Sequence, residues 1–406
     1  MSFFNNEAEM QSWLADELDK CDGLGELIIN IDEFEQAEIK NIEERSIFKS
    51  FESCLSSLHI TEVISKNENI SIDKKQSLKP DFLLYSSESE AIIIVELKNI
   101  VGPSRQAGTE LSAYACETRT YMPFLTENDI CNVIISPCWP TLLKHCIFNE
   151  IFWGQKNIIC LEPVRYEGDI RLSIKDIGDF SMVNTGMKIS GKHVAGYQLC
   201  LYDNELYGQN KNRERLDKFI PQMKSSLAVM SQEGNRQKGH GFAFLWKDHL
   251  SISLAPYSIT ICNISAFKSI ERFLHNTEWY EDTNGMQKRF IELLQNHAPS
   301  GHGDSLLKIN RTGQRFLKSV CNPQSEGYLD WEDLHELMKG RAEFIAFQGW
   351  GVFGGLFNEL LIKAYENGAT DTSRMCPTLG FQVINEIIDP DYNFIHSHWL
   401  EAPYDD

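Results

Sequence analysis

The sequence predicts an α/β protein with two domains: a mixed sheet covered by helices, followed by a second α+β region. The chain has 406 residues, more than one hydrophobic core usually organises. Strand-like and helix-like segments alternate up to about residue 165, and beyond about residue 180 the pattern is less regular. We therefore expect a helical extension over residues 1–34, an α/β domain over 35–175 and an α+β domain over 176–406.

The elements of the first domain follow from periodicity and from turn residues. Helical spacing of apolar residues, or a capping residue such as Ser104, predicts helices, and runs rich in β-branched residues between polar turns predict strands. The predicted helices are residues 6–20, 35–58, 104–118 and 140–154. The predicted strands are residues 60–65, 79–85, 91–98, 130–136 and 157–163. From the second helix onward the order is αβββαβαβ.

The C-terminal region mixes both kinds of segment without a repeat. Its predicted strands are residues 196–204, 241–246, 250–256 and 258–265, and its predicted helices are residues 266–298 and 331–367. The glycine-rich segment 349–355 lacks the GxxxxGK[ST] pattern of a phosphate loop, so we interpret it as packing or a helix break. His396 and His398 have no third partner, so they do not make a zinc site.

Composition indicates the class of protein and its compartment. Apolar residues make up 42% and charged residues 24% of the chain, as in ordinary globular proteins. No run approaches the roughly 20 apolar residues of a membrane span, and the acidic N-terminus is unlike a signal peptide. The 11 cysteines are scattered, with no CxxC pair, which is typical of a reducing compartment. We expect a cytoplasmic protein that does not contact membranes.

The charge distribution opposes unaided nucleic-acid binding by the first domain. The net charge is −20, and residues 1–180 hold 31 acidic against 16 basic residues. The basic clusters at residues 211–215, 235–238 and 308–318 are usually solvated faces. In so acidic a chain they are nevertheless the best candidates for contacts with phosphates.

Two acidic residues and a lysine form the strongest chemical pattern. Pro80-Asp81 opens one predicted strand, and Glu96-Leu97-Lys98 closes the next. If the intervening turn centres between residues 88 and 89, Asp81 lies opposite Glu96, with Cβ atoms about 4.5–5.5 Å apart. Facing carboxylates repel unless a cation lies between them, which predicts a divalent metal. Strand alternation places Lys98 on the same face as Glu96, and the carbonyl of Leu97 could complete the coordination.

This arrangement suits phosphodiester hydrolysis, in which a metal polarises the phosphate and a lysine stabilises the developing charge. The residues resemble the PD-(D/E)XK (restriction-endonuclease-like) nuclease superfamily over about residues 35–165. The resemblance implies an αβββαβ core with a mixed sheet and metal ligation (Mg²⁺ or Mn²⁺) by Asp81 and Glu96. It also implies a catalytic role for Lys98.

Two accessory residues are also expected from this resemblance. Many members of the superfamily carry a glutamate on the helix before the first strand. At 100° per residue, Glu44 falls in the middle of the apolar stripe of that helix, whereas Glu52 lies about 100° away. We therefore prefer Glu44. Several subfamilies carry a glutamine on the helix after the lysine, where this chain aligns Gln106, Glu110 and Tyr114.

Three functions remain open at this point. The first is a metal-dependent endonuclease, with DNA as the favoured substrate; by analogy, a bacterial defence or restriction context would suit it. The second is a nuclease-fold subunit without activity, which binds or regulates. The third is a nuclease that cleaves RNA. In each case we expect the C-terminal region to supply recognition, regulation, homo-oligomerisation or contact with a partner protein.

Overall fold

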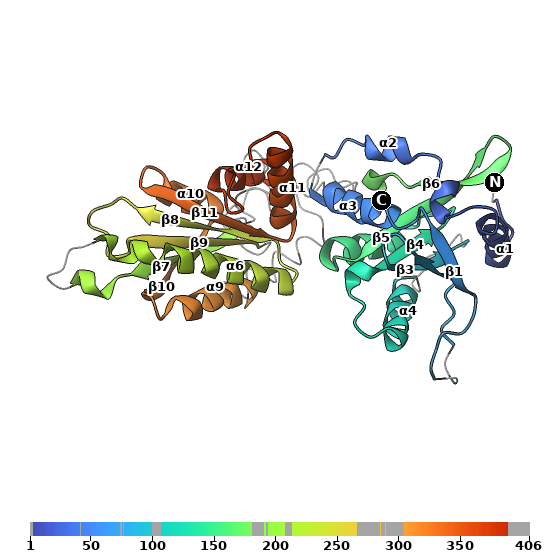
Figure 1. The fold of residues 1–406 in the computed structure, drawn as a ribbon, viewed down its shortest axis with the longest axis horizontal. Helices are drawn as coiled ribbons and strands as arrows, with labels where there is room; N and C mark the ends of the chain where they lie inside the picture. The colour runs from blue at the N-terminus through green and yellow to red at the C-terminus, as the bar shows by residue number, and fades with distance from the viewer. Residues whose placement is uncertain are drawn as a thin grey trace. The chain divides into compact units, whose positions relative to one another are not determined.

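The computed structural model divides into two compact units, residues 1–187 and 188–406, which are drawn in Figure 1. It describes residues 3–40, 42–73, 75, 77–99, 107–180, 191, 194–207, 213–265, 285, 289 and 304–388. The predicted extension 1–34 belongs to the first unit, where Met10 and Leu14 are fully buried, and is not separate from it. Among the described residues, no helix is both long and apolar enough to span a membrane.

Unit 1 is a mixed six-stranded sheet with helices. Its helices are α1 (Glu7–Leu18), α2 (Ile31–Glu35), α3 (Ile42–Leu55), α4 (Ala107–Tyr121) and α5 (Thr141–Phe148). Its strands are β1 (Thr61–Lys66), β2 (Phe82–Ser86), β3 (Ala91–Leu97), β4 (Ile130–Ile135), β5 (Asn157–Tyr166) and β6 (Asp169–Ile174). The strands lie in sequence order, and only the β3–β4 and β4–β5 pairs are parallel.

The two faces of this sheet are covered by different helices, as Figure 1 shows for α3 and α4. On one face, the Cys54 side chain of α3 contacts Cys131 of β4. In the parallel ladder Glu96 pairs with Ile134, and Ile94 pairs with Asn132, so these four side chains share the other face. That face packs against α4. The central strands are therefore buried on both sides, which explains their continuous apolar sequences.

Unit 2 is an antiparallel five-stranded sheet with helices. Its strands are β7 (Val194–Tyr202), β8 (Gly241–Asp248), β9 (Tyr257–Ile264), β10 (Asn322–Asp330) and β11 (Ala342–Trp350), in the order β10-β7-β9-β8-β11. Its helices are α6 (Ile220–Arg236), α9 (Asp304–Leu317), α10 (Trp331–Met338), α11 (Val352–Glu366) and α12 (Pro377–Ile387). Leu227 of α6 and Ile309 of α9 pack with Leu199 and Ile259 of the sheet in one core.

Several sequence-based predictions of single elements are wrong. The helix predicted over 35–58 begins later, as α3 at Ile42; residue 35 is the last of α2, and residues 36–40 are not helical. The helix predicted over 331–367 is interrupted by the strand β11: α10 ends before Gly340, whose φ is +74°, and α11 begins only after Gly351. Gly351 has a φ of +57°, a conformation that residues with a side chain rarely adopt. Residues 250–256 form turns instead of a strand. Most of the helix predicted over 266–298 lies outside the described residues.

Candidate active site

The β2–β3 hairpin has the predicted register. Phe82 pairs with Val95 and Tyr85 with Ile92, so the next pair along the ladder is Asp81 and Glu96. Asp81 comes directly before β2, Glu96 is the penultimate residue of β3, and Lys98 follows β3. Glu96 and Lys98 are buried, with exposed fractions of 4% and 8%. The hairpin therefore gathers two carboxyl groups and one ammonium group at one end of the sheet.

Hydrogen bonds hold Asp81 in place from two directions. Its Oδ2 accepts a hydrogen bond of 2.7 Å from the backbone N–H of Leu97. Its Oδ1 accepts one of 3.1 Å from the side-chain amide of Gln11, which comes from α1. The predicted N-terminal extension therefore contributes a residue to the site. Since each carboxylate oxygen has two lone pairs, both oxygens of Asp81 retain acceptor capacity.

Lys98 lies between two carboxylates. Its Nζ donates to Oε1 of Glu96 at 2.5 Å and to Oε2 of Glu110, on α4, at 2.8 Å. Its backbone N–H donates to the carbonyl of Ile135 at 2.9 Å, which continues the ladder with β4. The second oxygen of Glu96, Oε2, is buried and has no hydrogen-bond partner among the described residues.

The electrostatics of the site favour a further cation. Burial raises the pKa of Asp81 to about 6, although the Leu97 N–H and Lys98 act in the opposite direction. Burial also raises the pKa of Glu96 to about 8; Lys98 opposes this shift and the charge of Asp81 adds to it. For Lys98, burial acts to lower the pKa, but Glu96 and Glu110 outweigh it and raise the pKa. The single positive charge of Lys98 therefore does not offset the negative charges of Asp81 and Glu96.

The donor atoms at the site fit a divalent metal. A strand residue points its N–H and C=O to the same side. Lys98 bonds toward β4, so the polar backbone groups of Leu97 point the other way, toward Asp81. The Leu97 carbonyl, the Asp81 carboxylate and the unpartnered Oε2 of Glu96 supply hard oxygen atoms, the kind of ligand that Mg²⁺ and Mn²⁺ prefer. Within the described residues there is no group of three or more His, Cys, Asp or Glu side chains suited to a metal. A metal bound here would therefore need the Leu97 carbonyl as a ligand.

Helix α4, on which the sequence predicted Gln106 as the accessory residue, and the N-terminal segment, for which no role was predicted, also approach the site. Tyr114 of α4 donates from its hydroxyl to the carbonyl of Lys79 at 3.1 Å, just before Asp81. Glu7 accepts from the backbone N–H of Asn99 at 3.3 Å, and its charge acts to raise the pKa of Asp81. In the sequence, Glu110 and Tyr114 lie on the same side of a predicted helix, and this spacing could have identified them as site residues. No local pattern links Glu7 or Gln11 to Asp81.

The two accessory predictions have different outcomes. Glu44 is buried and Glu52 is exposed, as the helix phase predicts. Glu44 Oε2 accepts from the backbone N–H of Lys40 at 2.8 Å, and Oε1 lies near Gly178. Its described contacts are therefore at the end of α3, and the structure does not show it joining Asp81 and Glu96. Gln106 lies outside the described residues.

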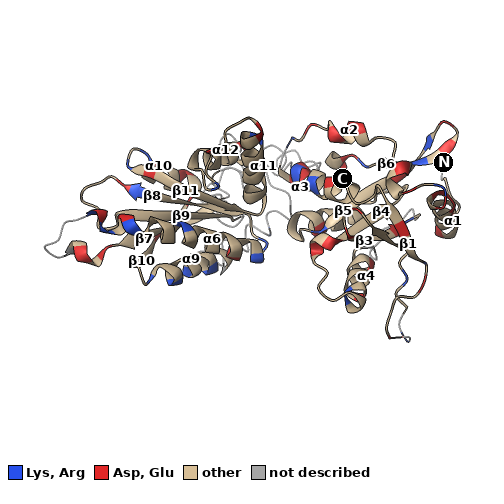
Figure 2. Cartoon of the chain, viewed as in Figure 1, with Lys and Arg blue, Asp and Glu red and all other residues tan. Residues whose placement is uncertain are grey.

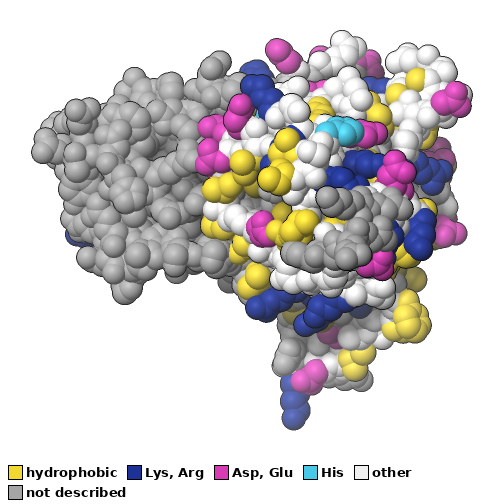
Figure 3. All heavy atoms as spheres, turned by 90° about the vertical axis from the view of Figure 1, so that its left-hand side faces the viewer, with side chains coloured by type: hydrophobic (Ala, Val, Ile, Leu, Met, Phe, Trp, Pro, Cys, Tyr) yellow, Lys and Arg dark blue, Asp and Glu magenta, His cyan; other side chains and the backbone are white. Residues whose placement is uncertain are grey.

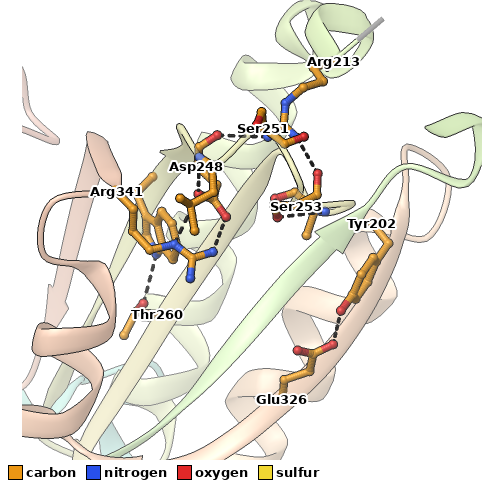
Figure 4. A network of polar contacts seen from close by, with 11 residues as sticks. Tyr202, Arg213, Asp248, Ser251, Ser253, Thr260, Glu326 and Arg341 are labelled. Atoms are coloured by element: carbon orange, nitrogen blue, oxygen red, sulfur yellow. Dashed lines mark hydrogen bonds and ion pairs between the residues drawn. The ribbon is translucent and has the colours of Figure 1, made fainter. Parts of the chain in front are cut away.

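The basic clusters of unit 2 differ in how free their side chains are to bind phosphates. Arg213 donates to the carbonyls of Ser251 at 2.9 Å and Asp248 at 3.1 Å (Figure 4), and Arg215 pairs with the buried Asp203. Arg236 pairs with Glu233 on its own helix. Arg213 and Arg215 are therefore held by contacts within the fold, whereas Arg236 is exposed and its ion pair lies on the surface.

Basic residues recur along α9 (Figure 2), and Lys318 follows directly after it. Arg311, Arg315 and Lys318 are exposed and have no ion pair among the described residues. On the described part of the face in Figure 3, acidic and basic side chains are intermixed. The α9 face is therefore the concentrated basic surface that remains from the three predicted clusters.

Comparison of the chain with protein-family models, with curated proteins and with solved structures finds no match in any of the three.

Proposed function

We propose that unit 1 is a metal-dependent nuclease that hydrolyses phosphodiester bonds, with DNA as its favoured substrate. The observation that carries the proposal is the hairpin register, which brings the half-buried Asp81 next to the buried Glu96, beside a buried lysine. Burying charge without a partner is costly, so an arrangement that places Asp81 opposite Glu96 requires a functional reason. A bound divalent cation is the reason that fits the oxygen donors.

The order and pairing of the elements support the same proposal. Helix α3, strands β1 to β3, helix α4 and strand β4 follow the αβββαβ order of the restriction-endonuclease-like core. The sheet is antiparallel across β1–β2–β3 and parallel from β3 to β5. In this core the acidic residues and the lysine come from the second and third strands, which is where Asp81, Glu96 and Lys98 are found.

Each residue has a distinct role in the proposal. Asp81, Glu96 and the carbonyl of Leu97 would hold Mg²⁺ or Mn²⁺, which supplies Lewis-acid polarisation of the scissile phosphate and activation of water. The Lys98 ammonium group would orient the attacking water and stabilise negative charge on the phosphate. Glu110 holds the Lys98 Nζ at 2.8 Å and so positions it. Tyr114 and Gln11 hold the segment that carries Asp81.

The nucleic acid would be bound through the basic face of α9. Residues 1–180 carry a net charge of −15, which repels a polyanion over a Debye length of about 8–10 Å. Arg311, Arg315 and Lys318 recur along one side of α9 and are exposed, so they can contact successive phosphates. Unit 2 therefore serves as the recognition element in this proposal.

The proposal is tested by incubating the full-length chain with supercoiled plasmid, single-stranded DNA and RNA, in Mg²⁺, in Mn²⁺ and in EDTA. We expect nicking of plasmid that needs the metal and is lost in Lys98→Ala. It should be retained in Lys66→Ala, which removes an exposed lysine of β1. Preferential cutting of RNA would change the substrate but keep the chemistry. Calorimetric binding of Mn²⁺ without cleavage of any substrate would favour the inactive regulatory subunit instead.

A further inference from the structure

A cavity lies in unit 1, on the same sheet face as Glu96 but lined by other residues. It has a volume of about 240 Å³ and is enclosed by α4, α5, β4 and β5. The β4 residue Ile134, which pairs with Glu96, and Ile158, which pairs with Asn132, line its sheet side. Helix α4 presents Glu110 to Lys98 and presents Ser112 and Ala115 to this cavity.

Most of the wall of the cavity is aliphatic. The apolar side chains come from two helices and two strands: Leu111, Ala115, Ile134, Leu143, Ile147 and Ile158. An apolar cavity of roughly 150 Å³ holds a benzene ring, whereas pockets for drug-sized ligands span about 300–1,000 Å³. A volume between these limits is suited to a ligand with one or two fused rings.

One buried polar atom of a residue that lines the cavity lacks a partner. The side-chain amide of Asn132 donates from Nδ2 to the carbonyl of Asn157 at 3.0 Å, which fixes the orientation of the amide. Its Oδ1 is buried and accepts no hydrogen bond in the described part of the chain, and Asn132 is only 4% exposed. An unsatisfied buried acceptor is costly, so the cavity favours a ligand that carries an N–H donor.

The charged residues of the cavity pair with one another. Arg119 forms an ion pair with Glu127 at 3.2 Å. Lys156 forms an ion pair with Glu150 and donates to the Ser112 hydroxyl at 2.9 Å. The two cations and two anions balance, so no net charge remains to select an ionic ligand. The cavity therefore favours a neutral molecule.

We propose that this cavity is a binding site for a neutral, nucleobase-like heterocycle whose N–H group donates to Asn132 Oδ1. The aliphatic walls would contact both ring faces, and the Asn132 carbonyl would select molecules with a donor at the ring edge. The proposal does not rest on the nuclease activity of unit 1, because it concerns residues outside the Asp81–Glu96–Lys98 cluster. Free bases and nucleosides are the small molecules of this chemistry.

The proposal is tested with two probes that differ by one donor group. N9-methyladenine carries an exocyclic amino group, whereas N9-methylpurine has no N–H group. We expect the full-length protein to bind N9-methyladenine about tenfold more tightly in calorimetric titration, because one hydrogen bond to a buried acceptor is at stake. In Asn132→Leu this preference should disappear. Equal affinity of wild-type protein for the two probes, or no binding of either at millimolar concentration, overturns the proposal.

A second pair of variants keeps the test valid if Asn132→Leu fails to fold. Ala115→Phe fills the cavity from α4 and should abolish binding of both probes. Cys116→Phe adds the same ring on the exposed side of the same helix and should leave both affinities unchanged. Circular dichroism checks that each variant is folded. Unchanged binding in folded Ala115→Phe would place the probe elsewhere and would overturn the assignment.

Discussion

Buried carboxylates in the two units have opposite environments. In unit 2, Asp248 and Asp203 are buried, and each faces an arginine: Arg341 pairs with Asp248 (Figure 4) and Arg215 with Asp203. Burial acts to raise the pKa of both aspartates, but the arginine hydrogen bonds and backbone donors outweigh it and hold each pKa below its usual range. In unit 1, burial raises the pKa of Asp81 and of Glu96.

In our proposal, this difference separates a structural role from a functional one. A carboxylate that meets a guanidinium and backbone N–H groups is fully satisfied and needs no further ligand. Asp81 and Glu96 face each other, and the one lysine that reaches Glu96 is shared with Glu110. This arrangement costs folding free energy in the absence of a cation, as sites arranged for binding often do. Four predictions concern this contrast, and one concerns the basic face of α9.

The largest expected effect is on catalysis. Asp81→Asn and Glu96→Gln should each lower metal-dependent plasmid cleavage by about 100-fold or more, because the metal loses a charged ligand. Asp248→Asn, in unit 2, should leave cleavage by folded protein within a fewfold of wild type. The measurement is the initial rate of nicking in Mg²⁺ at 25 °C. Wild-type rates for Asp81→Asn or Glu96→Gln would refute the site assignment.

The same substitutions should have opposite effects on stability. Asp248→Asn leaves Arg341 without its anion and should destabilise the protein by about 2 kcal/mol. Glu96→Gln removes a poorly compensated carboxylate, so the metal-free protein should keep or raise its melting temperature at pH 8.5. Glu343→Gln, at an exposed position of β11, is the control and should change stability little. Thermal unfolding in EDTA gives all three values; marked destabilisation by Glu96→Gln would contradict the contrast.

The two units should also respond to pH in different windows. Raised pKa values at Asp81 and Glu96 mean that the folded state binds these protons more tightly than the unfolded state. Their contribution is complete below about pH 4 and is lost as pH rises through 6 and 8. The lowered pKa values of Asp203 and Asp248 act in reverse, and stability is lost below about pH 4.

Differential scanning calorimetry of the metal-free protein tests this difference. From pH 5 to 8.5 we expect the transition of unit 1 to fall in temperature while that of unit 2 stays nearly constant. Glu96→Gln should flatten the dependence of unit 1. A unit 1 transition that rises over this range would show that its carboxylates are already compensated.

Sequence alone predicted the fold of unit 1 better than that of unit 2. The strands β2 to β5 were predicted within a few residues, because central strands carry continuous β-branched sequence and end at polar turns. In unit 2, β11 was missed, since Phe344, Phe347 and neighbouring apolar residues also satisfy helical spacing. Strand β10 was missed because it pairs only with β7 and carries mostly exposed residues.

The candidate site was predictable only where one hairpin creates it. The hairpin register could be calculated from the turn, so Asp81, Glu96 and Lys98 could be placed together before the structure was known. Gln11 and Glu7 come from a helix more than 60 residues away in sequence, and no periodicity reports such a contact. Glu110 lies in a predictable helix, but its contact with Lys98 depends on how α4 packs on β3.

Binding of nucleic acid should depend on the basic face of α9. Replacing Arg311, Arg315 and Lys318 by glutamine should weaken duplex binding about tenfold and flatten its salt dependence, because each phosphate contact contributes about −0.9 to the log–log slope. Lys98→Ala should leave the slope nearly unchanged. The measurement is binding to a labelled duplex across a salt series, with Ca²⁺ in place of Mg²⁺. An unchanged slope in the triple variant would remove unit 2 as the recognition element.

The smallest effect is expected at another buried carboxylate of unit 1, Glu44. Its Oε2 accepts from the backbone N–H of Lys40, whereas Oε2 of Glu96 has no hydrogen-bond partner among the described residues. If it also supports the site, Glu44→Gln should lower cleavage several-fold, because outer ligands of metal sites typically contribute about 10–100-fold and Glu44 lies further out. Glu52→Gln, one exposed glutamate on the same helix, should have no effect.

Rates of both variants at several Mg²⁺ concentrations distinguish the two roles of Glu44. A supporting role predicts that the loss in Glu44→Gln diminishes at high Mg²⁺, since weaker metal affinity is then offset by mass action. A purely structural role predicts a lower melting temperature and a rate, per folded molecule, that equals wild type at every Mg²⁺ concentration. The second result would place Glu44 with Asp203 and Asp248 among the structural carboxylates, and the functional group would then be confined to the residues that the β2–β3 hairpin and α4 bring together.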